Sequence, residues 1–468
     1  MSEAAIASQD EAGTIGALAR WVLDPGPIGP ASIERAALLV LDTLGCGIAG
    51  LVDPLSDIVR DFAVAASDKS CSLIGGGRAS LAGAVFANGV IVRVLDLNDY
   101  LINEVKGQPS SGGHPSDSIP IALAIGEARQ RPGKEVLAAI VMGYELYARL
   151  QSLMDRRGRW DGVTVTGLVA PAIAGRLMGF GEEALAHALA LGIARAATPR
   201  AVRGGHLSAA KNIANAQVAE AGLAAALLAA RGVTGPLGIL DQEGGMGALF
   251  EEGDARAILS EPLGAESCVD RAKIKAYPAL ATSQAAITAA FELHRTLGPD
   301  IARMRRLDFV MADYPLLRRQ AADPGRLDPQ SKESADHSFP FLVAVALIDG
   351  ALGLAQYEGE RWHDPQVRAV MAKITMDFDA DWVRRAPRSY PATLVAHLED
   401  GSTRRAEIAY PPGAAPGGVT ADAVIDKFHR VAADRLAAAA RERIIAEALA
   451  LPRSASPERL LALLAPAA

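Results

Sequence analysis

The sequence of 468 residues has very little cysteine. Its three cysteines, Cys46, Cys71 and Cys268, lie far apart, and none belongs to a Cys-x-x-Cys pair. Structural zinc sites and iron–sulfur clusters need several thiolates at close spacing. We therefore expect no cysteine-ligated zinc or iron–sulfur cluster, so any dehydration chemistry would have to proceed without iron.

The chain also lacks an excess of basic residues. Its formal net charge is -7 at pH 7, with 47 Lys and Arg against 54 Asp and Glu. A nucleic-acid partner would require a basic stripe, and none is visible in the sequence. We expect no nucleic-acid partner, so an anionic ligand would have to be bound by a local basic pocket.

Long apolar runs are absent as well. The run Phe339 to Ile348 ends at a charged residue, well short of a membrane span. Met1 to Ile15 carries three acidic residues and lacks the basic and apolar regions of a signal peptide. These features predict a cytoplasmic protein without a membrane partner. The sequence has no Gly-x-Ser-x-Gly motif, which argues against a covalent hydrolase.

Hydrophobic residues make up 50% of the chain and predict a large folded core. Residues 31–49, 81–95, 118–130, 133–151, 163–178, 183–197 and 211–231 have the spacing of Ala- and Leu-rich helices. This pattern predicts a large all-helical domain whose first part covers residues 1–270. The motif Gly45-Cys-Gly-Ile-Ala-Gly50 has no preceding strand, so we interpret its glycines as close helix packing and not as a dinucleotide site.

The pattern changes after Arg271. Residues 304–313 and 373–379 alternate in the manner of strands, and 393–410 reads as a hairpin around Glu399-Asp-Gly-Ser402. Residues 422–450 and 457–464 return to a helical pattern. We predict a mainly α protein in which an α+β lid domain, residues 271–412, is inserted into the helical domain, and residues 413–468 rejoin that domain.

The stretch Arg93-Val-Leu-Asp-Leu-Asn-Asp-Tyr100 and the following Ser111-Gly-Gly-His-Pro-Ser-Asp-Ser118 contain the first candidate site residues. Asp96, Asp99 and His114 stand beside Gly, Pro and Ser, where the backbone leaves the helix and side chains can converge on a cleft. Such residues can perform acid–base chemistry. A turn with ordinary capping residues would look similar.

Basic residues cluster in two places. The segment 200–211 carries Arg203, His206 and Lys211 around two glycines at a predicted helix start, and Lys273-Ile-Lys275 lies at the predicted domain junction. Arginine binds a carboxylate through two hydrogen bonds, and lysine supplies a compact charge. The clusters therefore favour a carboxylate ligand, although any one of these residues could simply be solvated.

Asp336 and His337 precede the apolar run that begins at Phe339. They could line a site, but Asp, His and Ser before a helix are also what helix capping requires. We favour capping or domain packing for both residues.

Several blocks together resemble the MmgE/PrpD family, which includes 2-methylcitrate dehydratase and cis-aconitate decarboxylase. They run in family order over nearly the whole chain: Asp42-Thr-Leu-Gly45, Ala87-Asn-Gly89, Leu95-Asp-Leu-Asn-Asp99, Gly113-His-Pro-Ser-Asp117, Gly143-Tyr-Glu145, Arg203-Gly-Gly-His-Leu-Ser-Ala-Ala-Lys211, Gly232-Val-Thr-Gly-Pro236, Lys275-Ala-Tyr-Pro278 with Gln284, Glu333-Ser-Ala-Asp-His-Ser338, Asp349-Gly350 and Lys427-Phe428.

The resemblance implies a homodimer of two-domain subunits with a cofactor-free site between the domains, and a small di- or tricarboxylate substrate. By position, Asp96 and His114 would be the acid–base residues. Lys211 and Lys275 would hold substrate carboxylates, with Arg203 assisting. The segments around Arg203 and Pro278 look more similar to the dehydratases than to the decarboxylases.

Three positions depart from the family pattern. Family members commonly carry threonine where Tyr100 stands and histidine near Asp161, two residues that would touch the substrate together with His206. They also carry an acidic residue or histidine soon after Pro278, where this chain has Ala279-Leu-Ala-Thr282. The absence of an ionisable group in that segment bears on the reaction itself.

The function hypothesis is a 2-methylcitrate dehydratase-like lyase that removes a proton α to a carboxylate and expels a β-hydroxyl group as water. Lys211, Lys275 and Arg203 would stabilise the enolate-like charge. His114 is the best general acid–base residue, and Asp96 would orient it or be the base. Two alternatives stay open, an epimerase or decarboxylase on the same scaffold and an inactive carboxylate-binding protein.

Overall fold

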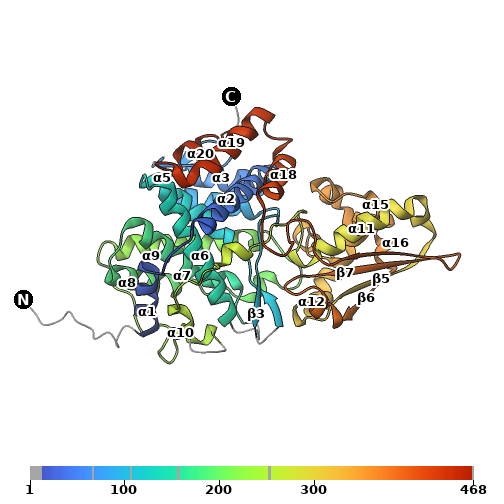
Figure 1. Cartoon of the computed structure of the whole chain (residues 1–468), viewed down its shortest axis with the longest axis horizontal. Helices are drawn as coiled ribbons and strands as arrows, with labels where there is room; N and C mark the ends of the chain where they lie inside the picture. The colour runs from blue at the N-terminus through green and yellow to red at the C-terminus, as the bar shows by residue number, and fades with distance from the viewer. Residues whose placement is uncertain (1–12, 66–67, 106–107, 155–158, 251–254, 466–468) are drawn as a thin grey trace, which may run out of the picture.

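The computed structural model describes residues 13–65, 68–105, 108–154, 159–250 and 255–465. It has two parts, a wide helical part and a narrower α+β part that projects from it (Figure 1). The fold is mainly helical with one small mixed sheet, which confirms the predicted class. Most of the Met1 to Ile15 segment considered for a signal peptide lies outside the described residues.

In the helical part, most helices are buried on nearly all faces and pack against one another through apolar side chains. Ala, Leu, Val and Ile residues throughout it are fully buried and form one continuous core. Its helices before the junction are α1 (Gly13–Leu23), α2 (Pro30–Gly50), α3 (Pro54–Val64), α4 (Leu81–Arg93), α5 (Ile119–Ala128), α6 (Gly133–Leu153), α7 (Thr166–Met178), α8 (Glu182–Ile193), α9 (Ala210–Ala229) and α10 (Ala255–Ser260).

The glycines at the end of α2 allow neighbouring helices to approach closely. A Cβ atom on Gly45 would lie 2.9 Å from a ring carbon of Phe428, and one on Gly50 would lie 2.4 Å from the carbonyl oxygen of Ile91. These contacts leave no room for a side chain. The close-packing interpretation of these glycines is confirmed.

The C-terminal helices α18 (Ala421–Ala432), α19 (Ala438–Ala450) and α20 (Glu458–Ala462) lie beside α2 and α3, at the opposite end of the colour scale (Figure 1). Residues from α18, α19 and α20 join the same hydrophobic core as α1 to α9. The prediction of one helical segment over 422–450 is wrong, because the chain breaks between α18 and α19. Arg441 stabilises the break by donating to the carbonyl oxygens of Ala433 and Leu436.

The α+β part is built on a four-stranded sheet of order β6-β5-β7-β8, comprising β5 (Met304–Ala312), β6 (Ile374–Asp379), β7 (Ala392–Leu398) and β8 (Thr403–Ile408). Strand β6 is parallel to β5, and β7 is antiparallel to both β5 and β8. The predicted hairpin around Glu399–Ser402 is confirmed.

The helices of this part are α11 (Gln284–Leu297), α12 (Pro315–Ala321), α13 (Pro324–Leu327), α14 (Lys332–Ala335), α15 (Phe339–Asp349), α16 (Pro365–Met371) and α17 (Asp381–Arg385). Helix α15 is apolar on all sides, and its residues Phe339 to Leu347 are buried in a second hydrophobic core. Three short helices, α12 to α14, connect strand β5 to the buried helix α15. These short helices lie at the junction with the helical part.

A small hairpin at the junction lies between the two segments that carry the candidate residues Asp99 and His114. Strands β3 (Ile102–Val105) and β4 (Gln108–Ser111) are antiparallel and separate Asp99 from His114 in the sequence. Tyr100 pairs with Lys273 through backbone hydrogen bonds of 2.8 and 3.0 Å. The hairpin thereby attaches the site segment to the start of the α+β part.

No single helix in the described part of the chain is both long and apolar enough to cross a membrane. Two sharply bent helix pairs, Pro30–Gly50 with Pro54–Val64 and Phe339–Asp349 with Leu354–His363, meet that criterion only when each pair is taken together.

Candidate active site

A cavity of about 310 Å³ lies where the helical part meets the α+β part. Its wall is rich in charged side chains of both signs. The helical part contributes Arg93, Asp96, Tyr100, His114, Asp117, Tyr147, Trp160, Asp161, Arg200 and Arg203, and the α+β part contributes Leu280, Thr282, Arg319, Asp323, Arg326, His337 and Tyr390. The wall therefore offers both positive and negative groups to a small polar molecule.

Asp96 is a buried carboxylate of this wall. It follows the end of α4, its backbone has the left-handed φ of +49°, and its side chain is buried. A non-glycine residue in this conformation is held there by its surroundings. Burial by itself would raise the pKa of Asp96, but the ammonium groups of Lys275 and Lys211, at 2.9 and 3.8 Å, hold that pKa well below its ordinary value. Asp96 is therefore ionised at neutral pH.

Three lysines from distant segments hold the turn that carries Asp96. Lys332 of α14 donates to the carbonyl oxygen of Val94 at 2.6 Å, Lys275 donates to that of Asp96 at 2.7 Å, and Lys427 of α18 donates to that of Leu97 at 2.9 Å. The last carbonyl groups of a helix lack partners within it and attract cations. Both parts of the molecule thus fix the position of one catalytic candidate.

Lys211 and Lys275 lie behind Asp96 and not on the cavity wall. Both side chains are completely buried, and Lys211 also contacts Asp336 at 3.2 Å. Burial lowers the pKa of Lys275 to about 8, although Asp96 opposes this change. The expectation that both lysines hold substrate carboxylates differs from this geometry, because protein carboxylates already neutralise their charges.

His114 lies on the cavity wall with its tautomer fixed by the backbone. Its Nδ1 atom is 2.5 Å from the carbonyl oxygen of Asp99. Because a carbonyl group only accepts hydrogen bonds, Nδ1 carries the proton and Nε2 keeps its lone pair. Burial and the nearby positive charges of Arg93 and Lys275 lower the pKa of His114 well below its ordinary value. His114 is therefore a neutral imidazole that can accept a proton.

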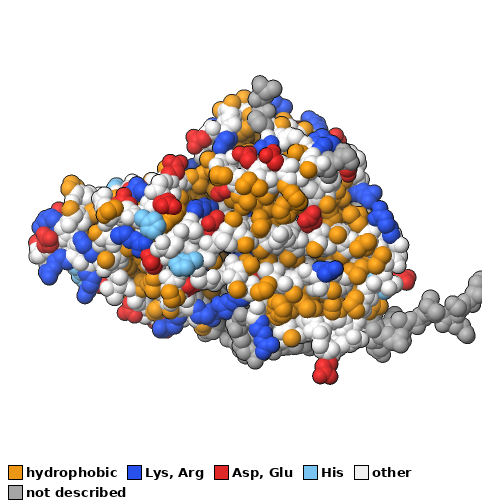
Figure 2. Space-filling model, turned by 180° about the vertical axis from the view of Figure 1, so that it is seen from behind, with side chains coloured by type: hydrophobic (Ala, Val, Ile, Leu, Met, Phe, Trp, Pro, Cys, Tyr) orange, Lys and Arg blue, Asp and Glu red, His pale blue; other side chains and the backbone are white. Residues whose placement is uncertain are grey.

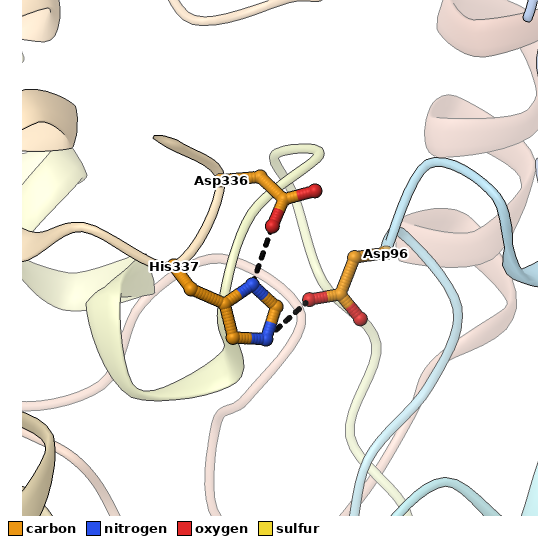
Figure 3. Close-up of side chains that lie close together, drawn as sticks. All are labelled: Asp96, Asp336 and His337. Atoms are coloured by element: carbon orange, nitrogen blue, oxygen red, sulfur yellow. Dashed lines mark hydrogen bonds and ion pairs between the residues drawn. The ribbon is translucent and has the colours of Figure 1, made fainter. Parts of the chain in front are cut away.

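Asp336 and His337 also belong to this cluster: neither caps α15, but their contacts with Lys211 and Asp96 pack the α+β part against the helical part, as predicted. Ser338 caps α15 instead, by accepting from the backbone N–H of Phe341. His337 lies between two carboxylates: its Nδ1 contacts Asp336, and its Nε2 is 3.6 Å from Asp96 (Figure 3). Burial and Lys211 lower the pKa of His337 to about 3, so this ring is also neutral at pH 7. The sequence signal was present, because only Ser338 is needed as the cap.

The same three residues invite comparison with a metal site. The ligand atoms of Asp96, Asp336 and His337 all lie within 4.8 Å of one another. Lys275 and Lys211, however, place two ammonium groups 2.9 and 3.2 Å from the two carboxylates. A cation would have to share these carboxylates with both lysines. The donor set fits an acid–base cluster neutralised by lysines better than it fits a metal centre.

The other predicted residues divide into two groups. Tyr100, Asp161 and Arg203 line the cavity, and Arg203 binds Asp161 at 2.8 Å. His206 is exposed and is not among the residues that line the cavity, so its predicted contact with the substrate lacks structural support. The two glycines before it turn the chain outward, with Gly205 at a φ of +67°.

The segment that lacks an ionisable residue does reach the cavity. Leu280, Ala281 and Thr282 line it, and the Thr282 hydroxyl group donates to Gln320 at 2.7 Å. This part of the wall is therefore uncharged. His337, which approaches from the same α+β part, provides an ionisable side chain on the same cavity.

The sequence matches two family models in succession. The MmgE/PrpD N-terminal domain matches residues 16–258, and the MmgE/PrpD C-terminal domain matches residues 277–451. The chain belongs to the MmgE/PrpD family. The resemblance predicted from the sequence blocks is therefore confirmed.

Curated relatives include enzymes with two different activities. Cis-aconitate decarboxylase of Homo sapiens is 25% identical over 79% of this chain and 77% of its own length. The 2-methylcitrate dehydratase of Cupriavidus necator is 26% identical over 79% of both chains. A cis-aconitate decarboxylase-like protein of Aspergillus oryzae is 24% identical over 98% of both chains. These similar values support an enzyme of this family and do not favour the dehydratases over the decarboxylases.

Proposed function

We propose that this protein is a lyase that removes a proton α to a carboxylate of a small di- or tricarboxylate and releases a β-hydroxyl group as water, as the name 2-methylcitrate dehydratase describes for several relatives. The observation that carries the proposal is His114. It is a neutral imidazole with a free Nε2 on a cavity that it shares with the ionised Asp96 and with several arginines.

The reaction would begin with proton transfer from the substrate's α carbon to Nε2 of His114. The Asp99 carbonyl oxygen already accepts a hydrogen bond from Nδ1–H, so it stabilises the imidazolium that forms. Negative charge then builds on the substrate carboxylate, and the arginines of the wall stabilise it. His114 can return its proton to the leaving hydroxyl group, so that one water molecule and one alkene are formed.

Lys211 and Lys275 would support this step indirectly. They keep Asp96 ionised, because their two ammonium groups outweigh the effect of its burial on its pKa. The ionised Asp96 lies beside both the cavity and His337. A fixed negative charge there stabilises an imidazolium and helps to orient the substrate. The proposal requires no cofactor, since protein side chains supply the positive charge.

An epimerase is the second candidate, and the presence of two histidines favours it. His114 comes from the helical part and His337 from the α+β part, and both are neutral on one cavity. One imidazole would remove a proton, while the other, after taking up a proton from solvent, returns that proton to the opposite face of the carbon. A decarboxylase on the same scaffold would need the same enolate stabilisation. The alternative of an inactive binding protein rested on the uncharged segment 279–282. His337 weakens this alternative, because it supplies an ionisable side chain on the same cavity.

The direct test is to mix the purified protein with 2-methylcitrate and to follow the absorbance of the unsaturated product. We expect turnover by the wild type and loss of turnover in His114→Ala. No turnover by the wild type, or full turnover by His114→Ala, would refute the assignment. Deuterium from D₂O in recovered substrate, without an alkene, would instead identify the epimerase.

We also propose that the protein forms a homodimer through its helical part, as the family resemblance implies. Hydrophobic side chains gather on the wide helical part in Figure 2, whereas charged side chains crowd the narrow α+β part. On α3, Ile58 and Phe62 are 63% and 69% exposed. Such apolar surface is typical of subunit contacts. Light scattering should give twice the mass of one chain, and a single-chain mass would contradict this proposal.

A further inference from the structure

Arg326 is a charged residue of the cavity wall, and two of its buried donor atoms make no hydrogen bond. It lies on α13 in the α+β part, and its side chain is 12% exposed. Its Nε and Nη1 atoms are buried and make no hydrogen bond. Nε lies 3.3 Å from Asp323, but the two groups are not aligned as a hydrogen bond.

Two other arginines of the wall, Arg203 and Arg93, also lie near carboxylates. Arg203 binds Asp161 at 2.8 Å, and Arg93 lies 3.5 Å from Asp96 and 3.7 Å from Asp117. One oxygen of Asp323 caps α13 by accepting from the backbone N–H of Gly325 at 3.0 Å, and the other lies near Nε of Arg326. Arg326 differs from Arg203 in that its nearest carboxylate accepts no hydrogen bond from it and its Nη1 atom has no partner.

Leaving these donors unpaired is unfavourable. A buried donor without a partner loses its hydration, and an arginine cannot escape by losing its proton at physiological pH. Its planar guanidinium group matches a carboxylate, which can accept two parallel hydrogen bonds from it. A carboxylate that enters the cavity would supply the missing partner.

The packing of α13 fixes Arg326 at this position. A Cβ atom on Gly325 would lie 2.3 Å from the carbonyl oxygen of Gly205, so the backbones of the two domains are in direct contact here. The same loop is bound to α14, since the backbone N–H of Leu207 donates to Ser334 at 3.0 Å. Arg326 is thereby held next to the loop that carries Arg203.

We propose that Arg326 binds a second carboxylate of the substrate, and that it makes the cavity selective for di- and tricarboxylates over monocarboxylates. This inference rests on the proposed function and deepens it. The helical part supplies the proton-transfer residue His114 and the bound pair of Arg203 and Asp161. The α+β part supplies the guanidinium group of Arg326, which would bind the distal carboxylate of the ligand.

The test is calorimetric titration of the full-length protein with citrate, succinate and propionate. Arg326→Gln should weaken citrate binding by roughly 10- to 100-fold, which corresponds to one charge-assisted hydrogen-bonding group. Propionate binding should stay within about twofold, and Arg326→Lys should recover part of the citrate affinity. A citrate affinity of Arg326→Gln equal to that of the wild type would overturn the inference, as would an absence of citrate and succinate binding to the wild type.

A matched control is Arg368→Gln. Arg368 binds Asp328, the residue after α13, at 2.6 Å and is not among the residues that line the cavity. Its replacement should leave citrate affinity unchanged, and an equal loss in this variant would overturn the inference by showing that any disturbance of α13 suffices. Circular dichroism checks that each variant is folded.

A second variant tests the positioning of Arg326. Gly325→Ala should weaken citrate binding although Arg326 is retained, because its methyl group must push α13 away from Gly205. Unchanged binding would overturn the positioning argument. Citrate binding that depends on Arg326, without any turnover, would support this inference and refute the proposed function. Turnover of 2-methylcitrate with an unchanged KM in Arg326→Gln would support the proposed function and refute this inference.

Discussion

The two parts of the molecule treat charge in different ways. In the α+β part many charged side chains pair at the surface, for example Arg303 with Asp400 at 3.3 Å, where both side chains are nearly half exposed. In the helical part Lys427 and Asp42 pair at 2.7 Å with almost no exposure. Surface pairs contribute little to stability, whereas breaking a buried pair is costly. Buried charged residues are therefore the ones whose replacement should have the largest effect on stability or function.

At the cavity, both parts of the molecule contribute buried charged or titratable side chains. Asp336, His337 and Arg326 are largely buried charged or titratable groups of the α+β part, and they meet Asp96 and His114 of the helical part there. The α+β part thus does more than cover the site. If it is a true partner in the chemistry, changes on its side of the cavity should be as damaging as changes on the other side.

The largest effect should follow removal of Asp96. Asp96→Ala would leave Lys211 and Lys275 buried without this counter-charge, which typically costs about 3–5 kcal/mol. We expect that loss in urea unfolding, together with loss of turnover. Asp57→Ala, which removes a 72% exposed carboxylate, should change stability by less than about 0.5 kcal/mol. Equal stability of the two variants would show that the lysines do not depend on Asp96.

The next effect compares the two histidines. His114→Ala and His337→Ala should each lower kcat by about 10²- to 10⁴-fold, as expected for loss of a proton-transfer group or of its charged neighbour. His397→Ala, which removes a histidine paired with Asp308 on the sheet, is the control and should retain full activity. Steady-state kinetics decides the outcome. Full turnover by His337→Ala would show that the histidine of the α+β part is not needed for the reaction.

A smaller effect concerns pH. The pKa values of His114 and His337 are both lowered, the latter to about 3, so both rings stay neutral as the pH falls from 8 to 6. The kcat/KM value should therefore hold down to pH 6, where an ordinary histidine, with a pKa near about 6.5, would be mostly protonated. On the alkaline side it should fall above about pH 8, when Lys275 loses its proton. An acidic limb centred near pH 6.5 would contradict this arrangement.

The smallest effect concerns Asp99, which lies three residues after Asp96 but has no lysine partner. Burial raises its pKa to about 7, and the hydrogen bond from Ser116 only partly opposes this. The folded state therefore binds the proton more tightly than the unfolded state does. The stability from this group is fully present below about pH 4 and is lost as the pH rises to 7.

Urea unfolding at several pH values tests this difference. The free energy of unfolding of the wild type relative to Asp99→Asn should decrease between pH 4 and pH 7 and then level off. No decrease over this range would mean that Asp99 is ionised in the folded protein, as Asp96 is.

Much of the fold could be predicted from the sequence because its periodic patterns are long. The buried helices α2, α6 and α9 and the strands β5 to β8 follow directly from apolar spacing. The break between α18 and α19 could not be predicted, because Ala and Arg continue a helical pattern through it. The carbonyl groups that Arg441 satisfies become visible only in three dimensions.

The candidate site was predictable in part. Asp96, His114 and Arg203 stood out because Gly, Pro and Ser surround them. For Asp336 and His337 the predicted domain packing is observed and the predicted capping is not, because a capping sequence and a site sequence look alike until the side-chain directions are known. The free donors of Arg326 and the position of Lys211 and Lys275 behind Asp96 depend on packing between residues far apart in the chain, which local sequence patterns do not encode.

The most direct test of the central claim is nuclear magnetic resonance of 2-methylcitrate and related polycarboxylates incubated with the protein in D₂O. The account predicts that wild-type protein forms an unsaturated product or exchanges the hydrogen α to a carboxylate, and that His114→Ala and His337→Ala both do so far more slowly. Polycarboxylates that bind but stay unchanged, with no deuterium at that carbon, would contradict it.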